Sequence, residues 1–320
     1  MSRAWKTAVV LNPRAGSGKA ERVWPQIGRQ LESRMGHVEL RRTQHSGHGI
    51  ELARDLLEHG YDRIIVAGGD GTVSEVANGF LERDRPVNPE ACLGLLPLGT
   101  GGDFRRTIGV SKDFRRAIDQ LGEAAPTRID AGRVRFQGRD GTPQTRYFIN
   151  VASFGMGGEV AARSSNFLSP LGGTVAFLYA SAVSLLGYRC KTVRLTVDQN
   201  VLPAASIFNV AVGNGRFHGG GMQACPRAVL NDGALEVTLI RCMSRFRVLK
   251  DFPVLYSDNI YRHRKVGHAR GRRLLAEADE PVRIEIDGEP LGTLPLEITV
   301  IPEALSVLIP PGGAPVALRR

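Results

Sequence analysis

Three glycine-rich segments carry the residue types that could handle a phosphate group. They are Asn12–Lys19, Gly68–Thr72 and Pro97–Arg106. Glycine lets backbone N–H groups come close to phosphate oxygens, and a helix N-terminus that follows adds a favourable dipole. Two carboxylates, Asp70 and Asp103, could act through a metal ion or orient groups near the phosphates. The pattern indicates phosphate chemistry, although each segment alone would also suit a turn whose carboxylate caps a helix.

The elements around these segments alternate between strand and helix. The predicted strands are Thr7–Leu11, Val38–Arg42, Arg63–Ala67 and Cys92–Leu96, and helical spacing covers Ala20–Leu31, Gly49–Leu57 and the residues from Gly71 to about Asn78. This order predicts a parallel sheet with helices on both faces, in which ligands bind outside the carboxyl ends of the strands. Each glycine-rich segment follows such an end, so the three are expected to form one phosphate-facing rim.

The pattern changes near Ala125, after which β-branched and alternating residues dominate. The predicted strands are Thr127–Phe136, Thr145–Phe154, Lys191–Asp198, Ser206–Gly213, Ala234–Ile240, Val282–Ile286 and Leu296–Ile301, with helical patterns near Glu159, along Thr174–Leu186 and around Phe246–Leu255. The predicted fold is therefore an α/β nucleotide-binding domain over residues 1–125, a mainly antiparallel β-rich domain over 126–310, and a tail over 311–320.

The composition is that of a globular protein with an excess of positive charge. The 320 residues are 42% hydrophobic and 23% charged, and the formal net charge is +10. Such a charge draws phosphates, nucleic acid or an anionic bilayer, and a basic surface kept for solubility explains it equally well. The basic segment Tyr261–Arg273 lacks the interleaved aromatic residues expected for single-stranded nucleic acid, so no nucleic-acid partner is predicted. It suits either a strand that faces anionic lipid or a solvated edge strand.

The cysteines and the uncharged stretch Leu171–Gly187 indicate whether the protein is expected in the cytosol or in a membrane. Four scattered cysteines without a C-x-x-C pair predict neither a zinc site nor a disulfide framework, which fits a reducing cytosol, and the N-terminus lacks a signal-peptide pattern. The stretch Leu171–Gly187 has no charge but contains glycine and serine, whereas a membrane-spanning helix needs about 20 mostly apolar residues. We therefore expect a buried helix of the second domain.

The motifs taken together resemble the diacylglycerol kinase catalytic family, in its soluble bacterial lipid kinase branch. The resemblance rests on N-P-x-x-G at Asn12–Gly16, G-G-D-G-T at Gly68–Thr72 and P-L-G-T-G-x-D-F at Pro97–Phe104. It extends over nearly the whole chain through Asn150–Gly158, Gly213–Gly221, Pro226–Gly233 and Asp287–Pro290. It implies an NAD kinase-like and diacylglycerol kinase-like fold with the active site in the cleft between the two domains.

The resemblance also implies roles for individual residues. The positions matching ATP-binding residues are Asn12, Pro13, Arg14, Ala15, Gly16, Thr43, Gly68, Gly69, Asp70, Gly71, Thr72, Val73, Ser74, Glu75 and Thr100. Asp232, with the backbone carbonyls of Val229 and Ala234, matches a structural Mg²⁺ site, and Glu289 matches the proton acceptor. Without the resemblance, Glu289 would be a solvent-facing residue beside the hairpin turn that Asp287-Gly288 predicts.

The expected activity is ATP-dependent phosphorylation of a membrane lipid, with diacylglycerol converted to phosphatidic acid in phospholipid biosynthesis as the first choice. The expected place is the cytoplasm, peripheral at an anionic inner membrane face, and a homodimer is one option for its assembly. Three positions depart from the family pattern: Ala15 stands where Ser is usual, and Ser74 and Gly102 stand where Asn is commoner. Three alternatives stay open: another lipid alcohol, a soluble substrate as in NAD kinase, or a nucleotide-binding protein without catalysis.

Overall fold

The first lobe is the predicted parallel sheet. The computed structural model describes residues 5–138, 140–166 and 173–313. Its first-lobe strands run in the order β2–β1–β3–β6, all parallel. Their bounds are β1 (Thr7–Leu11), β2 (Val38–Arg42), β3 (Arg63–Gly68) and β6 (Cys92–Pro97). Apolar runs let β1, β3 and β6 lie buried on both faces, whereas the edge strand β2 is buried only at Val38. All four strands lie where they were predicted.

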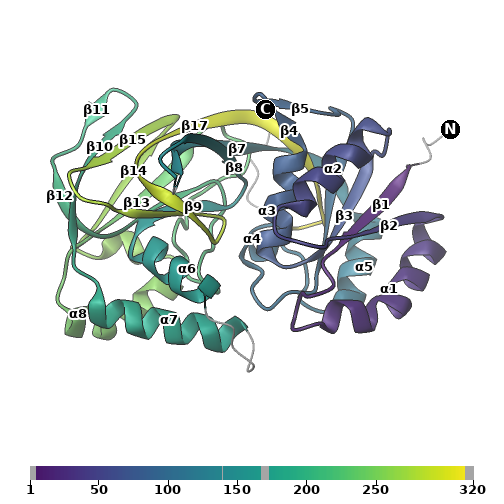
Figure 1. Cartoon of the computed structure of the whole chain (residues 1–320), viewed down its shortest axis with the longest axis horizontal. Coiled ribbons are helices and arrows are strands. Elements are labelled where there is room, and N and C mark those ends of the chain that lie inside the picture. The colour runs from purple at the N-terminus through teal and green to yellow at the C-terminus, as the bar shows by residue number, and fades with distance from the viewer. Residues whose placement is uncertain (1–4, 139, 167–172, 314–320) are drawn as a thin grey trace.

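Helices cover both faces of this sheet (Figure 1). They are α1 (Lys19–Met35), α2 (His48–Glu58), α3 (Asp70–Gly79) and α5 (Phe114–Glu123), with the short α4 (Asp103–Thr107) following the third glycine-rich segment. Helix α1 packs with α5, and α2 packs with α3. Two-residue strands β4 (Leu81–Glu82) and β5 (Arg85–Pro86) follow α3 as a separate hairpin.

The second lobe is mainly antiparallel, which confirms the predicted fold class. Its strands are β7 (Ala125–Gly138), β8 (Pro143–Phe148), β9 (Val151–Gly155), β10 (Lys191–Val197), β11 (Asn200–Val201), β12 (Ala205–Gly213), β13 (Leu235–Arg241), β14 (Val266–Gly271), β15 (Arg273–Ala278), β16 (Arg283–Ile286) and β17 (Glu289–Ile309). Its helices are α6 (Met156–Asn166), α7 (Gly173–Gly187) and α8 (Arg245–Asp251), with 3-10 turns η1 (Phe252–Tyr256) and η2 (Ile260–Arg262).

Two strand predictions in this lobe are wrong in detail. Thr145–Phe154 is not one strand but β8 and β9, because the N–H groups of Ile149 and Asn150 bond to the Asp287 carboxylate instead of a neighbouring strand. Tyr261–Arg273 is not a single strand either. The segment starts in the 3-10 turn η2, continues as β14 and ends at Arg273, where β15 begins.

Strand β17 connects the two lobes. It runs antiparallel to β7 over most of its length, and near its end Ser306 and Val307 pair with β6 of the first lobe. Its late residues belong to the first hydrophobic core, while Ile298 and Val300 belong to the second. The chain therefore returns to the first lobe at its end, and the domain limits 1–125, 126–310 and 311–320 stay predictions.

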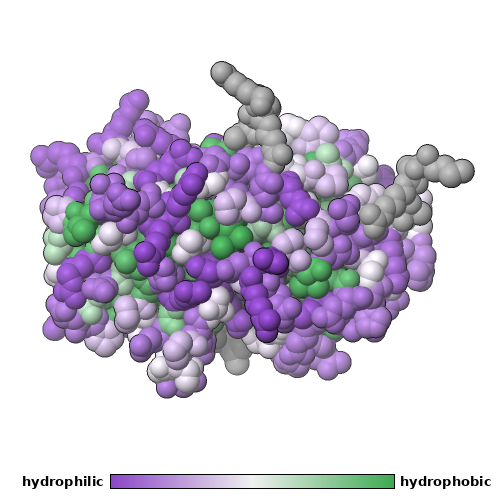
Figure 2. Space-filling model, turned by 90° about the horizontal axis from the view of Figure 1, so that it is seen from above, coloured by the Kyte–Doolittle hydropathy of each residue, from purple (hydrophilic) through white to green (hydrophobic). Residues whose placement is uncertain are grey.

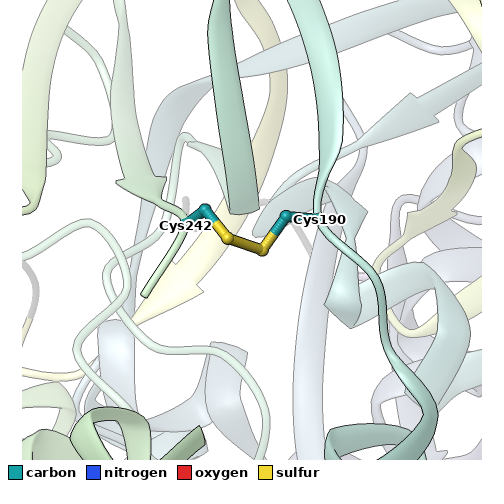
Figure 3. Close-up of a disulfide and its surroundings, with 2 residues drawn as sticks. All are labelled: Cys190 and Cys242. Atoms are coloured by element: carbon teal, nitrogen blue, oxygen red, sulfur yellow. A yellow bond between two sulfur atoms is a disulfide. The ribbon is translucent and has the colours of Figure 1, made fainter. Parts of the chain in front are cut away.

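The prediction that the cysteines form no disulfide is wrong. Cys190 and Cys242 are joined, with their Cα atoms 5.8 Å apart and a separation of 52 positions in sequence (Figure 3). Their neighbours Lys191 and Arg241 both align with Ile207 of β12, on its two sides, so the sheet brings the cysteines to the same end of that strand. Sequence spacing could not reveal a pairing that depends on sheet topology. The cysteine pattern consequently no longer favours a reducing compartment.

The helix predicted along Leu171–Gly187 lies partly at the surface of the second lobe. In the part of the chain that the structure describes, no helix has the length and apolar character needed to cross a membrane. Leu171 and Gly172 lie outside the described residues; from Gly173 onward the helix is confirmed, but Tyr179 is 54% exposed and Leu186 is 67% exposed. The helix is therefore not buried as predicted.

The face seen from above is mostly polar, with hydrophobic residues in separate groups (Figure 2).

Candidate catalytic site between two lobes

The three glycine-rich segments touch one another at the carboxyl ends of β1, β3 and β6. The carbonyl of Gly68 accepts hydrogen bonds from the N–H groups of Leu98 and Gly99, at 3.0 and 3.1 Å. A methyl group on Gly99 would lie 2.5 Å from the Cα of Gly69, and one on Gly16 would lie 2.6 Å from the Leu98 carbonyl oxygen. Only glycine allows backbones to approach this closely. The segments thus form one continuous rim lined by backbone.

Asp70 joins the second segment to the third. Its carboxylate accepts hydrogen bonds from the N–H groups of Gly102, at 2.6 Å, and Asp103, at 3.1 Å. Burial raises the pKa of Asp70; the hydrogen bond from Gly102 opposes this, and the negative charge of Asp103 adds to it. The carboxylate therefore caps α4, whose N-cap residue Gly102 lies 32 residues further along the chain, and not its own helix α3.

A second set of hydrogen bonds fixes the other side of the rim. The Asn12 side-chain amide donates to Thr72 Oγ1 at 3.0 Å, which ties the first segment to α3. The Glu75 carboxylate accepts from the N–H groups of Gly47 and Gly49, at 2.7 and 2.9 Å, and so anchors the start of α2. Helices α2 and α3 are thereby fixed to each other beside the rim.

The positions matched to ATP-binding residues differ in exposure. The side chains of Thr43, Val73 and Ser74 are buried, and Ala15 is buried as well, whereas Arg14 and Thr100 are exposed. At position 15, where the resemblance led us to expect serine, the side chain is a buried methyl group. For the buried positions, contact with a nucleotide would have to come from the backbone.

Asp103 connects the two lobes. Its carboxylate accepts from Arg106 Nη1 at 2.7 Å and from the N–H of Gly220 at 2.8 Å, although Gly220 lies 117 residues away in the second lobe. Nearby, the N–H of Arg216 donates to Thr107 Oγ1 at 3.1 Å. The sequence offered no sign of these contacts beyond the resemblance of Gly213–Gly221 to a family motif.

The hairpin predicted at Asp287-Gly288 is confirmed, and Asp287 in its turn is buried while Gly288 is exposed. Both residues have positive φ, 48° and 89°, as two-residue hairpin turns require. The Asp287 carboxylate accepts from the N–H groups of Ile149, Asn150 and Val151, at 3.2, 3.2 and 3.0 Å. Burial raises the pKa of Asp287 to about 7, although these donors favour its ionised form. The turn is thus clamped to the segment between β8 and β9.

Glu289 follows this turn and is partly buried. Burial raises the pKa of Glu289; the negative charge of Glu75 adds to this, and the positive charge of Arg146 opposes it. Since Glu75 belongs to α3, the Glu289 carboxylate lies within electrostatic reach of the first lobe. A carboxyl group with a raised pKa is suited to accept a proton.

Sequence reasoning missed a contact between the partly buried His218 and the buried Glu285 carboxylate beside the turn. His218 Nε2 lies 3.3 Å from Glu285 Oε1, and the Glu285 side chain is only 1% exposed. The other carboxylate oxygen of Glu285 accepts from the N–H of Gly288 at 2.7 Å. The pair links the turn before Glu289 to the loop that carries Gly220. No spacing pattern could have identified it, because its members lie far apart in sequence.

The predicted metal loop offers oxygen donors but is occupied by a cation of the protein. Asp232 forms an ion pair with Arg270 and accepts from the N–H of Ala234 at 3.1 Å. Asp130 accepts from the N–H of Gly233 at 2.7 Å; burial raises its pKa to about 6, and the charge of Asp232 adds to this. Two close carboxylates with backbone carbonyls suit a hard cation such as Mg²⁺, provided that the guanidinium moves aside.

A different cluster, His45, His48 and Glu51, brings potential metal ligands within 4.8 Å of one another among the described residues. His48 Nδ1 accepts from the N–H of Gln44 at 3.0 Å, so in the neutral ring Nε2 carries the proton. That nitrogen then offers no lone pair to a metal, and the cluster is not a ready metal site.

Comparisons with known proteins agree with this architecture. Residues 6–134 match the diacylglycerol kinase catalytic domain, and residues 150–309 match the YegS C-terminal NAD kinase beta sandwich-like domain. A Chromohalobacter salexigens protein named "Probable lipid kinase YegS-like" is 30% identical over 96% of this chain and 94% of its own. A Staphylococcus saprophyticus diacylglycerol kinase is 26% identical over 95% of each chain.

The fold is also that of a solved structure. The crystal structure of a diacylglycerol kinase from Bacillus anthracis superposes with a TM-score of 0.72 at 22% identity, over 97% of this chain and 99% of that one. The similarity in sequence and in fold extends over both lobes, and the chain belongs to the diacylglycerol kinase family that includes the YegS-like lipid kinases.

Proposed function

We propose that this protein transfers the γ-phosphate of ATP to a hydroxyl group of a membrane lipid, with diacylglycerol as the first candidate. The observation that carries the proposal is the contact of three glycine-lined loops in one rim. Glu289 lies near enough to Glu75 of the same lobe for the charge of Glu75 to raise its pKa. A backbone rim of this kind suits a phosphate chain. We infer a lipid as the phosphate acceptor from the relatives that are named lipid kinases.

The rim residues would position the nucleotide. Backbone N–H groups and small side chains would surround the phosphates, and they belong to Asn12–Gly16, Gly68–Thr72 and Thr100. Each oxygen of the Asp70 and Asp103 carboxylates already accepts an N–H. We therefore assign both residues a role in positioning the loops around the phosphates. Most of the catalysis in phosphoryl transfer comes from positioning and charge neutralisation.

Glu289 would act as the general base. It accepts the proton of the lipid hydroxyl while that oxygen bonds to the γ-phosphorus, the bond from phosphorus to the β–γ bridging oxygen breaks, and ADP leaves. The products are a phosphorylated lipid, ADP and a proton held on Glu289. The raised pKa of this carboxyl makes it a stronger base than an exposed glutamate.

Mg²⁺ has two proposed places. Bound with ATP, it would neutralise phosphate charge; bound at Asp232 with the carbonyls of Val229 and Ala234, it would brace the loop before β13. The second place requires Arg270 to release Asp232. We place the protein in the cytoplasm, where ATP is available, at the inner face of the membrane.

A substrate panel tests the proposal. Purified protein, labelled ATP and Mg²⁺ are incubated with mixed micelles of diacylglycerol, phosphatidylglycerol or a sphingoid base, and separately with NAD. Label in a lipid product supports the lipid kinase. Phosphorylation of NAD without any lipid product would favour the soluble-substrate alternative, and ATP binding without any transfer would favour a non-catalytic nucleotide-binding protein.

A further inference from the structure

Exposed hydrophobic side chains gather on one side of the second lobe. Of the seven large hydrophobic residues exposed in the described part of the chain, five lie on α7, α8 and η1. They are Tyr179, Leu186, Phe246, Leu249 and Tyr256, which are 46% to 86% exposed. We call this group the α7–α8 face; both helices lie along the lower edge of the lobe in Figure 1. Single exposed apolar residues are ordinary, whereas a group of them marks an interaction surface.

Helix α7 presents an apolar stripe to the outside. Its exposed residues include Tyr179, Ala182 and Leu186, which lie three and four positions apart and therefore share one side of the helix. The sequence has no charged residue from Gly173 to Tyr188. Another side of α7 packs on α6. A helix with an apolar outer stripe needs an apolar partner on that side.

Helix α8 adds large hydrophobic side chains with cations beside them. Phe246 is 86% exposed and Leu249 is 61% exposed, while Val248 packs inward. Arg245 and Lys250 are exposed on the same short helix. Residues 241–265 contain seven arginines or lysines and two aspartates, and one of these, Asp251, is engaged by its neighbours Arg247 and His263. The uncompensated charge on this face is positive.

The disulfide holds the two helices in one surface. Helix α7 ends at Gly187, shortly before Cys190, and α8 begins at Arg245, shortly after Cys242. The bond between the sulfur atoms therefore ties neighbouring ends of the two helices (Figure 3). This link limits independent movement of the helices and keeps their apolar sides in a fixed relation.

We propose that the α7–α8 face docks the protein on an anionic lipid bilayer. Apolar side chains flanked by cations match the boundary between acyl chains and anionic headgroups. A second copy of the chain is the weaker match, because a two-fold contact through this face would bring its positive charges together. The opposite face is mostly polar, as a side turned to water would be (Figure 2). The inference rests on the proposed lipid substrate and assigns the docking to α7 and α8, not to Tyr261–Arg273.

Sedimentation with vesicles tests the apolar part of this face. Wild type should pellet with vesicles of phosphatidylglycerol mixed into phosphatidylcholine, and less with pure phosphatidylcholine. The double variant Phe246→Asp/Leu249→Asp should bind about 100-fold more weakly, since each lost apolar contact weakens partition by roughly tenfold. Val201→Asp is the matched control, because Val201 is 78% exposed on β11, outside the α7–α8 face. Its binding should equal wild type, and melting curves verify that all variants fold.

A second pair of variants tests the charges. Arg245→Glu/Lys250→Glu should weaken binding to the anionic vesicles by at least about 25-fold, since the loss of each basic residue alone costs roughly fivefold and each new carboxylate is repelled by the lipid. Arg116→Glu, exposed on α5 of the first lobe, is the control and should change nothing. Wild-type binding should also fall as salt is raised, because salt screens exposed charges.

Each outcome decides between the two proposals. Equal pelleting of wild type and the Phe246→Asp/Leu249→Asp variant would overturn the docking surface, as would a wild-type dimer that this variant converts to monomer while vesicle binding is unchanged. Phosphorylation of lipid in detergent micelles without vesicle binding would overturn docking and leave the proposed function standing. Vesicle binding through this face without phosphorylation of any lipid would support docking and reject the function.

Discussion

Gly99→Ala perturbs the point where two of the proposed phosphate loops touch. The new methyl group would lie 2.5 Å from the Cα of Gly69 and 3.0 Å from its nitrogen. The φ of Gly99 lies outside the left-handed region, so alanine can adopt this backbone and the effect comes from the contact alone. Carbon atoms prefer about 3.5–4.0 Å between them. The loops must therefore move apart by roughly 1 Å.

This displacement should affect both stability and activity. Forcing an extra methyl group into a packed contact costs about 1–3 kcal/mol. A shift of about 1 Å in groups that position a substrate can lower the rate by roughly 100-fold. We expect the melting temperature to fall modestly, while ATP affinity and the rate of phosphate transfer fall more.

Calorimetry with ATP, thermal melting and a lipid phosphorylation assay measure these effects. Gly122→Ala is the matched control: it makes the same chemical change on α5 with no atom within 4 Å of the new methyl group. It should leave activity unchanged and stabilise the protein by about 0.5–1 kcal/mol. Wild-type ATP binding and transfer in the Gly99 variant would refute the close contact of the loops and its role in catalysis.

Three further predictions follow from individual contacts. Arg146→Gln removes a positive charge that lowers the pKa of Glu289, so the rise in kcat with increasing pH should move to higher pH. An unchanged pH profile of kcat would show that Arg146 does not affect the ionisation of Glu289. Replacing Cys190 and Cys242 by serine should lower the free energy of unfolding in urea by up to about 4 kcal/mol, from closure of the 52-residue loop, and a reducing agent should do the same to wild type only. Asn78→Ala removes two hydrogen bonds, of 2.8 and 2.9 Å, between α3 and the β8 backbone. It should cost about 1–3 kcal/mol, and a loss below 0.5 kcal/mol would contradict that estimate.

The helices and strands of the first lobe were predictable because local residue patterns determine them. Arg63–Ala67 is a continuous apolar run followed by glycines, and the structure places β3 at Arg63–Gly68 and starts α3 at Asp70. A shared rim was then expected because each loop follows the carboxyl end of a parallel strand, and the backbone contacts at Gly69 and Gly99 place the loops together.

The second lobe was harder because long-range contacts decide its details. The break between β8 and β9 depends on Asp287, a residue 137 positions away from Asn150. The link from Asp103 to Gly220 and the pairing of Cys190 with Cys242 likewise depend on topology and leave no local pattern. Hydrophobic periodicity predicted the helix at α7 but not that its outer side is exposed.

The central claim is that Glu289 accepts the proton of a lipid hydroxyl beside ATP held on the first lobe. The most direct measurement compares kcat for lipid phosphorylation and the ATP dissociation constant in wild type and Glu289→Gln. The account predicts a loss of kcat of about 10²–10⁴-fold with ATP affinity and melting temperature unchanged. A Glu289→Gln enzyme that phosphorylates the lipid as fast as wild type would contradict it.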